Sequence, residues 1–193
     1  MAQKIITVFG SSRPAEGNAD YEEARTLGQA LAARAFAVCT GGYGGAMEAA
    51  SRGAKDVGGK TYGVTAEFFA RKANAWVDVE VRKKTWAERL FSLIEIGDGF
   101  VVCKGGTGTL VELAVVWEML NKSIVRNKPV VVLGDFWQPI LERVREVEQR
   151  PGARVWGEAN GRLVHSAVNA EEAADYLARN FGGRPEKKME IGK

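Results

Sequence analysis

Two glycine-rich segments, each placed between an apolar run typical of a strand and a run typical of a helix, most constrain what this chain can fold into. They are FAVCTGGYGGAME at residues 36–48 and FVVCKGGTGTLVE at residues 100–112. At such a junction the loop and the start of the helix present unpaired backbone N–H groups and a positive helix end, which together bind an anion such as a phosphate. Two such junctions in one small domain predict a nucleotide-binding protein.

The rest of the chain repeats this alternation. Continuous apolar runs predict strands at residues 5–9, 36–39, 61–64, 77–81, 100–103, 129–133 and 163–165. Apolar residues spaced three or four apart predict helices at residues 21–36, 46–57, 85–96, 109–121, 139–147 and 170–181. Strands that alternate with helices form a parallel sheet with right-handed crossovers. We therefore expect an α/β fold, a Rossmann-like three-layer sandwich with a mainly parallel, doubly wound sheet.

Length and composition predict one domain. The 193 residues are 46% hydrophobic and 26% charged, as in an ordinary globular protein, and a chain of this length buries a sizeable core. We expect a single Rossmann-like nucleotide-binding domain over residues 1–183, followed by a polar tail over residues 184–193. The formal charge of +3 without a basic stripe argues against a nucleic-acid partner. Because no apolar run could span a bilayer or form a signal peptide, we expect a cytoplasmic protein without a membrane partner.

The two cysteines and the single histidine predict neither a disulfide nor a metal site. Cys39 and Cys103 each end a predicted strand. These strands would flank the first strand about 9 to 10 Å apart, too far for a disulfide, so both cysteines should be buried hydrophobes. His165 ends a late strand and is expected to be structural. We therefore expect no metal and no cofactor.

Three loops follow predicted strands and should meet at the carboxyl edge of the sheet, where doubly wound folds bind ligands. They are residues 10–13, 41–45 and 105–109. The predicted phosphate-binding and nucleotide-binding residues, all in or next to these loops, are Gly10, Ser11, Ser12, Gly41, Gly42, Gly45, Met47, Gly105, Gly106, Thr107, Gly108 and Thr109. Two alternatives stay open: the glycines of the last loop form only a tight turn with Thr109 capping the helix, and Met47 fills the core rather than covering a base.

Neither glycine loop has the pattern of the common nucleotide motifs. Residues 105–109 lack the Lys-Ser/Thr ending of nucleoside-triphosphate loops, and residues 41–45 are not a clean GxGxxG segment. The chain also lacks an acidic residue placed to bind an adenosine ribose after the next strand. These absences argue against a triphosphatase and a dehydrogenase, and one phosphate fits the loop at residues 105–109 better than three.

Glu112 is the candidate catalytic carboxylate. It follows Thr109 by three residues, so both should lie on one face of the first helical turn beside the phosphate. The helix dipole there favours the ionised form, so we expect a base, or a negative charge that stabilises a cationic transition state, rather than a resting general acid. The alternative is an ordinary carboxylate at a helix N-terminus, and Glu48 after Gly45 has the same two interpretations.

Taken together, four segments resemble the LOG family, the cytokinin riboside 5'-monophosphate phosphoribohydrolases that are often labelled lysine-decarboxylase-like. The segments are VFGSSR at residues 8–13, TGGYGGAMEAASRGA at 40–54, AER at 87–89 and KGGTGTLVE at 104–112. Their order and intervals agree with the family over roughly the first two thirds of the chain. A joint match of this kind is much more specific than any one loop.

The resemblance implies a hydrolase that cleaves the N-glycosidic bond of a purine nucleoside 5'-monophosphate such as AMP, giving free base and ribose 5-phosphate. It places the catalytic roles on Glu112 and Arg89, with Arg89 fixing the phosphate, the ribose or Glu112. Without the family register, Arg89 would be interpreted as a surface ion pair with Glu88 or Glu95. Arg82 is out of register and is expected on the surface. The resemblance also implies a homodimer with a small-molecule nucleotide as ligand.

This chain departs from the family signature PGGxGTxxE and its neighbouring motifs at four positions. Lys104 replaces the proline, Val111 a second glutamate, Leu90 the lysine of an Arg-Lys pair, and Thr40 a glycine. The changes favour keeping an alternative, a non-catalytic nucleotide or molybdenum-cofactor carrier or sensor with the same fold. A lysine decarboxylase is excluded, because the chain does not supply both a Schiff-base lysine and a large cofactor domain.

Overall fold

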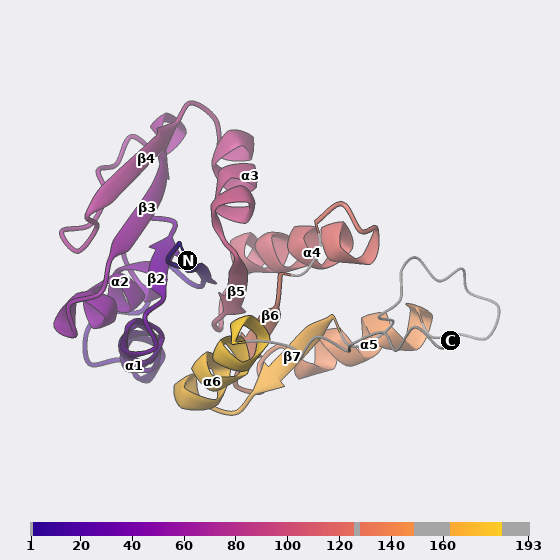
Figure 1. Cartoon of the computed structure of the whole chain (residues 1–193). Helices are drawn as coiled ribbons and strands as arrows, with labels where there is room; N and C mark the ends of the chain where they lie inside the picture. The colour runs from indigo at the N-terminus through magenta and orange to yellow at the C-terminus, as the bar shows by residue number, and fades with distance from the viewer. Residues whose placement is uncertain (1, 126–127, 149–162, 183–193) are drawn as a thin grey trace, which may run out of the picture.

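A computed structural model describes residues 2–125, 128–148 and 163–182. Seven parallel strands form one sheet in the order β4-β3-β2-β1-β5-β6-β7 (Figure 1). The strands are β1 (Ile5–Phe9), β2 (Ala37–Thr40), β3 (Thr61–Ala66), β4 (Val79–Lys83), β5 (Gly99–Val102), β6 (Val130–Leu133) and β7 (Val164–Ala167). The helices are α1 (Ala19–Ala33), α2 (Ala46–Asp56), α3 (Trp86–Ile96), α4 (Thr107–Asn121), α5 (Gln138–Glu148) and α6 (Ala170–Phe181), with a short 3-10 turn η1 (Glu67–Phe69).

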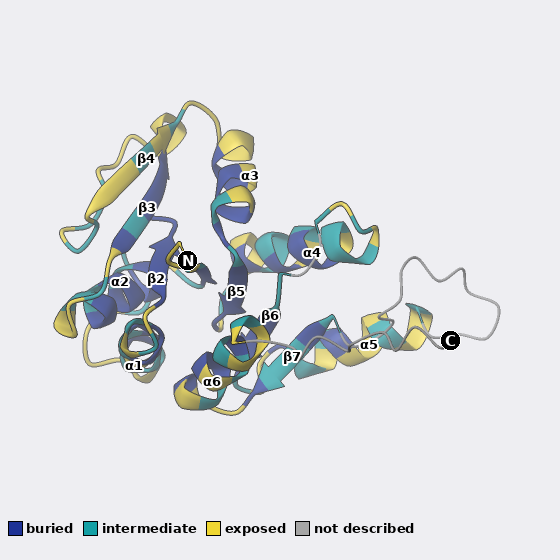
Figure 2. Cartoon of the chain, viewed as in Figure 1, coloured by how far each residue is buried: buried dark blue, intermediate teal, exposed yellow. Residues whose placement is uncertain are grey.

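Two apolar cores, one on each face of the sheet, hold the helices in place. Alternating residues of a strand point to opposite faces, so Val101 joins the core under α1, α2 and α6, whereas Phe100 and Val102 join the core under α3, α4 and α5. The central strands are buried on both faces, and the edge strand β4 is largely exposed (Figure 2). The result is a three-layer α/β sandwich, as the sequence predicts.

The strand order reverses at β1, which lies between β2 and β5. This is the doubly wound topology, and the predicted mainly parallel sheet is parallel throughout. Cys39 lies in β2 and Cys103 directly follows β5, the two strands that flank β1, and both cysteines are free and buried, as predicted. His165, on the edge strand β7, stacks on Tyr176 with ring centroids 3.9 Å apart. The predicted polar tail at residues 184–193 lies outside the described residues.

Local chemistry explains where the helices begin. Asn18 caps α1 by accepting a hydrogen bond from the Asp20 amide, so the helix begins two residues before the predicted start. Thr85 and Glu88 form a reciprocal capping box at the start of α3. The start of α4 also lies two residues earlier than predicted, at Thr107, and this shift changes the environment of Glu112.

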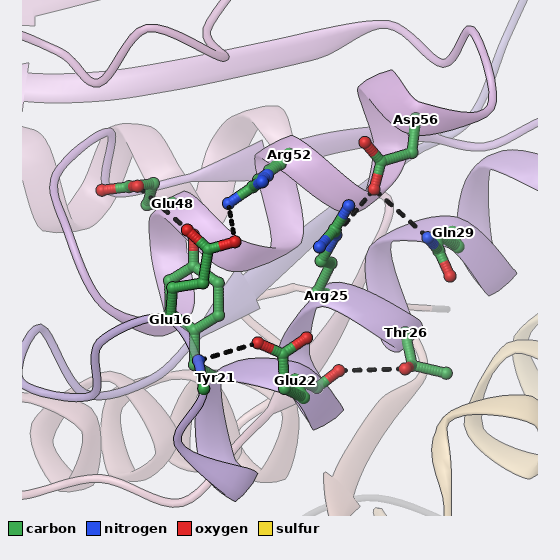
Figure 3. A network of polar contacts seen from close by, with 10 residues as sticks. Glu16, Tyr21, Glu22, Arg25, Thr26, Gln29, Glu48, Arg52 and Asp56 are labelled. Atoms are coloured by element: carbon green, nitrogen blue, oxygen red, sulfur yellow. Dashed lines mark hydrogen bonds and ion pairs between the residues drawn. The ribbon is translucent and has the colours of Figure 1, made fainter.

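Helices α1 and α2 pack closely through paired glycines and a polar network. A Cβ added to Gly28 would overlap the Ala50 carbonyl, and one added to Gly53 would overlap the Arg25 carbonyl. Figure 3 shows the ion pairs and hydrogen bonds that surround this contact. Among them are Arg25 to Asp56 at 2.7 Å, Arg52 to Glu16 at 2.9 Å and Tyr21 to Glu48 at 3.2 Å. The network connects α2 to the segment before α1, and this segment follows the loop at residues 10–13.

Candidate functional site

A pocket of about 890 Å³ opens at the carboxyl edge of the sheet. Its wall comes from the loop after β1 and the start of α1, the β2–α2 segment, η1 and the residues after it, α3, the loop and helix that follow β5, and the segment after β6. The lining residues are Gly10, Ser11, Ser12, Arg13, Pro14, Asn18, Asp20, Tyr43, Met47, Phe69, Arg71, Trp86, Arg89, Leu90, Lys104, Gly105, Gly106, Thr107, Gly108, Thr109, Glu112 and Phe136. The pocket therefore lies where a doubly wound sheet is expected to bind a ligand.

The loop at residues 105–109 leaves backbone donors open to this pocket. Helix α4 begins at Thr107, its N-cap residue Gly106 offers no side-chain acceptor, and the first helical bond runs from the Leu110 amide to the Gly106 carbonyl. The amides of residues 106–109 thus have no acceptor within the helix. A Cβ added at Gly106 or Gly108 would meet no atom within 4 Å. This arrangement can hold an anion at the positive end of α4.

One alternative interpretation was that Thr109 caps the helix. In the structure the N-cap residue is Gly106, and no side chain forms a capping hydrogen bond. Thr109 lies in the first turn of α4, 4% exposed, and its side chain packs against Gly105. A Cβ at Gly105 would overlap the Thr109 hydroxyl, so this glycine is required by packing. We call the amides of residues 106–109 the α4 cradle.

The glycine loop at residues 41–45 is closed, which means that its amides bond to other parts of the protein. Gly41, Gly42 and Gly45 do not lie on the pocket wall. The amide of Ala46, at the start of α2, donates to the Ser11 carbonyl at 2.8 Å, and the Gly42 amide donates to the Thr40 hydroxyl at 3.1 Å. The amides of Gly42 and Ala46 are therefore bonded to neighbouring protein atoms and are not open to a phosphate. The first loop contributes Gly10, Ser11 and Ser12 to the pocket, as expected.

Arg89 lies inside the pocket wall rather than on the helix surface. It is 7% exposed, donates from Nε to the Val64 carbonyl at 2.8 Å and from Nη2 to the Gly41 carbonyl at 3.1 Å. Its Nη1 lies 3.9 Å from Glu112 Oε1, and its guanidinium stacks over the ring of Tyr43 at 5.4 Å. Burial lowers the pKa of Arg89, and the Glu112 carboxylate opposes that shift. Two backbone carbonyls thus hold the guanidinium of Arg89 in place, and its Nη1 faces the Glu112 carboxylate.

Glu112 lines the pocket with its side chain 15% exposed. Burial raises the pKa of Glu112 to about 7, and the nearby Arg89 opposes that rise. The sequence analysis expected an ionised carboxylate held by the helix dipole. Because α4 begins at Thr107, however, Glu112 lies in the second turn, where the dipole is weaker, and desolvation has the larger effect. Glu112 can therefore both accept and donate a proton near neutral pH.

The structure also places three other residues that the sequence analysis discussed, which are Met47, Glu48 and Arg82. Met47 lines the pocket, and its Sδ lies 3.8 Å from Arg89 Nη2, so it both packs and faces the cavity. Glu48 does not line the pocket and accepts a hydrogen bond from the Tyr21 hydroxyl. Arg82 is half exposed, with a 3.9 Å contact to Glu67, as predicted for a surface residue.

Sequence reasoning did not select several residues of the pocket wall as site residues. They are Arg13, Pro14, Asn18, Asp20, Tyr43, Phe69, Arg71, Trp86, Leu90, Lys104 and Phe136. Arg13 and Lys104 stand inside the quoted motifs, and both carry charges next to a glycine loop, which is a signal that could have found them. The aromatic residues Phe69 and Trp86 carry no such signal, because their place depends on how η1 and α3 fold over the edge of the sheet.

Within residues 2–125, 128–148 and 163–182, the structure contains no group of three or more histidine, cysteine or acidic side chains that could hold a metal ion. In the same part of the chain, every helix is too short or too polar to cross a bilayer.

The fold and the pocket define a class: Rossmann-like α/β proteins with a pocket at the switch point of a parallel sheet. Residues 3–158 match the model of the SLOG cluster4 family, and the chain belongs to that family. The resemblance to the LOG proteins drawn from the sequence motifs is thereby confirmed at the level of the family.

Among curated proteins, a cytokinin riboside 5'-monophosphate phosphoribohydrolase of Rhodococcoides fascians is 29% identical over 150 residues, 73% of this chain and 74% of that protein. One of the same name from Mycobacterium marinum is 37% identical over 116 residues, 56% of this chain and 62% of that protein. Among solved structures, the molybdenum cofactor binding protein of Rippkaea orientalis has a TM-score of 0.75 at 25% identity, covering 94% of this chain and 99% of that one. The molybdenum cofactor carrier protein of Chlamydomonas reinhardtii, at 23% identity and a TM-score of 0.71, covers 94% of this chain and all of its own, and shows the fold alone.

Proposed function

We propose that this protein hydrolyses the N-glycosidic bond of a purine nucleoside 5'-monophosphate, AMP or an adenine-modified cytokinin nucleotide, to free base and ribose 5-phosphate. The curated relatives named phosphoribohydrolase support the class of reaction. The observation that carries the proposal is that one helix, α4, supplies both the open amides of the cradle and the Glu112 carboxylate to the same pocket. A phosphate and a reacting sugar carbon of one nucleotide would then both be held by a rigid element.

The cradle would anchor the 5'-phosphate. Amides in fixed positions at a helix N-terminus bind a phosphoryl group without rearrangement, so the binding energy of the phosphate serves to position the ribose. The open space at Gly106 and Gly108 lets phosphate oxygens approach the backbone. Ser11 and Ser12 add hydroxyls on the facing wall.

Glu112 would act on the sugar. Departure of the base leaves positive charge on the ribose in an oxocarbenium-like transition state, as in glycoside hydrolysis. Ionised Glu112 stabilises that charge and accepts one proton from the attacking water. The water oxygen bonds to C1' as the bond to the base breaks, the base takes up a proton from solvent, and Glu112 then returns its proton to solvent, which restores the carboxylate. A pKa of about 7 suits a carboxylate that gains and loses a proton near neutral pH.

Arg89 would position Glu112 rather than bind the substrate freely. Two of its nitrogens are held by the carbonyls of Val64 and Gly41, so the guanidinium has little freedom to swing toward a ligand. Its remaining charge faces Glu112 and favours the ionised carboxylate. Leu90 beside it keeps this part of the pocket apolar.

The test compares Glu112→Gln with the matched variant Glu48→Gln, which makes the same change in the first turn of α2, away from the pocket wall. Incubation with AMP and chromatography of released adenine should show a loss of roughly 10²- to 10⁴-fold for Glu112→Gln and none for Glu48→Gln. In the wild type, kcat/KM should rise with pH and level off above about 7.

The same assay separates the hydrolase from a carrier or sensor. Binding of AMP without release of adenine, unchanged by Glu112→Gln, would reject the hydrolase and favour the carrier. The homodimer and the cytoplasmic location expected from the sequence remain predictions, which light scattering of the purified protein and cell fractionation test.

A further inference from the structure

Two aromatic side chains that the proposed reaction does not use, Phe69 and Trp86, line the pocket. They are 37% and 42% exposed, so the protein alone does not bury their rings. Both come from one corner of the fold, because β3 and β4 pair in a register that places Ala66 opposite Lys83. Phe69 and Trp86 each follow one of these paired residues by three positions. We call Phe69 and Trp86 the aromatic end of the pocket.

Neighbouring contacts fix the ring of Phe69. It lies edge-to-face with Tyr43, with the ring centroids 5.5 Å apart, and edge-to-face with Phe68, with the centroids 5.3 Å apart. Tyr43 is itself held by Ala66, whose amide donates a hydrogen bond to Tyr43 Oη at 2.9 Å. A ring that is already fixed can bind a flat ligand without the entropic cost of ordering its own side chain.

A chain of contacts leads from the α4 cradle to the aromatic end. The cradle and Glu112 both belong to α4, and Glu112 Oε1 lies 3.9 Å from Arg89 Nη1. The Arg89 guanidinium in turn lies over the ring of Phe69, 5.8 Å from its centroid. A nucleotide has its parts in the same order, which is phosphate, sugar and base. With the phosphate in the cradle and C1' at Glu112, the base would reach the aromatic end.

We propose that Phe69 and Trp86 hold the base of the nucleotide by stacking, and that they thereby favour purine over pyrimidine monophosphates. The inference rests on the proposed function, since it assumes a nucleotide whose phosphate lies in the α4 cradle. A flat base stacks on an aromatic side chain through its face, and the two fused rings of a purine cover more area than the single ring of a pyrimidine. The aromatic end therefore determines which class of base the pocket accepts.

Calorimetric titration with AMP, UMP and ribose 5-phosphate tests this proposal. The parent protein for the titrations is Glu112→Gln, in which AMP should stay intact. The parent should bind AMP roughly three- to tenfold more tightly than UMP. Phe69→Leu and Trp86→Leu should each weaken AMP binding about five- to thirtyfold, the range that stacking of one base supplies. Binding of ribose 5-phosphate, which has no base, should change less than about twofold.

Two further substitutions in the same parent are matched controls. Phe91→Leu makes the same change on α3, at a residue that is 47% exposed but does not line the pocket, and should leave AMP binding unchanged. Phe136→Leu makes it inside the pocket but beside the cradle, where the ring centroid lies 6.0 Å from Lys104 Nζ. It should change AMP binding less than about twofold. Thermal unfolding checks that every variant is folded.

Three results would overturn the stacking site: equal affinity of the parent for AMP and UMP, equal weakening of AMP and ribose 5-phosphate by Phe69→Leu and Trp86→Leu, or a base-dependent loss with Phe136→Leu alone. Adenine release from AMP by the wild-type protein keeps the two proposals apart. If AMP is cleaved but the Phe69 and Trp86 variants bind all three ligands like the parent, only the stacking site is rejected. If AMP binding depends on Phe69 and Trp86 but no adenine is released, only the hydrolase is rejected. If no nucleotide binds, both are rejected.

Discussion

The two glycine loops look alike in sequence but differ in what their glycines do. In the loop at residues 41–45 the glycines let segments approach each other: Gly42 and Gly45 adopt positive φ, and a Cβ at Gly45 would overlap the Ser11 carbonyl. In the loop at residues 105–109, Gly106 and Gly108 have negative or helical backbone angles and face open space. One loop is closed by the protein, and the other is open to a ligand.

The difference shows that a glycine motif by itself does not identify a binding loop. What decides is where the amides after it donate. The Ala46 amide donates to the Ser11 carbonyl in another segment, whereas the first amides of α4 have no acceptor in the helix or elsewhere among the described residues. The closed loop still serves the site, because the Gly41 carbonyl holds Arg89 and a Cβ at Gly41 would overlap that guanidinium. The closed loop supports the arginine, and the open loop faces the pocket.

The largest effect is expected at Gly45, which tests the closed loop. Its φ of 73° and ψ of −140° lie in a region that only glycine adopts readily, and an added Cβ would also lie 2.5 Å from the Ser12 carbonyl carbon. Gly45→Ala should therefore lower the free energy of unfolding by about 3 kcal/mol or more, from strain and overlap together. Denaturant unfolding measures the change.

Gly58→Ala is the control for Gly45→Ala. Gly58 also has a positive φ, of 77°, but a Cβ there would meet no atom within 4 Å. Gly58→Ala should therefore lower the free energy of unfolding by about 1 kcal/mol, because the backbone is strained there but no atoms overlap. Equal losses for the two variants would show that the close approach at Gly45 contributes nothing, and the distinction between a closed and an open loop would fail.

The second prediction concerns Glu112, which lies in α4, the helix that begins within the open loop. The pKa of Glu112 is about 7 in the folded protein against an ordinary value of 4.5, so between these pH values the folded state binds more protons than the unfolded state. Stability of the wild type should then fall as pH rises through this window, by up to about 3 kcal/mol from this group. Glu112→Gln removes the dependence and should gain stability relative to the wild type between pH 5 and pH 8.

Comparison at two pH values provides the control for this second prediction. Any cost of leaving Arg89 with an uncharged partner is present in the variant at both, whereas the cost of ionising Glu112 appears only at the higher pH. Urea unfolding of both proteins at pH 5 and pH 8 measures the change. A stability difference that is the same at both pH values would mean that the Glu112 carboxylate is not desolvated in the folded protein.

The sequence predicts the sheet, its parallel order and the edge at which the pocket opens, because these follow from the period of apolar residues and the glycine junctions. The resemblance to the LOG family, and not these signals, places Arg89 in the site with the phosphate, the ribose or Glu112 as its partner, and the structure places the Arg89 and Glu112 side chains 3.9 Å apart. The spacing of apolar residues and the positions of the loops depend on residues that are close in the chain, so a single sequence is enough to predict them.

The rest depends on contacts between distant segments. Whether the amide of Ala46 is free depends on Ser11, thirty-five positions earlier, and no local pattern reports that hydrogen bond. The pKa of Glu112 depends on how deeply α4 is buried and on a helix start two residues away from the predicted one. For the same reason, Phe69 and Trp86 appear in the pocket wall without a signal in their own segments.

The smallest effect on the fold, and the sharpest test of the open loop, is expected for Gly108→Ala. The added methyl group meets no protein atom within 4 Å and lies in the first turn of α4, where alanine favours the helix, so thermal stability should be unchanged or slightly higher. The methyl group does, however, enter the space above the cradle and should crowd a bound phosphate, weakening AMP binding by about 1–2 kcal/mol, or roughly tenfold. Titration with AMP and thermal unfolding of the same sample measure both effects. A variant that is as stable as the wild type and binds AMP as tightly would show that no phosphate approaches Gly108, and the two loops would then differ in packing alone.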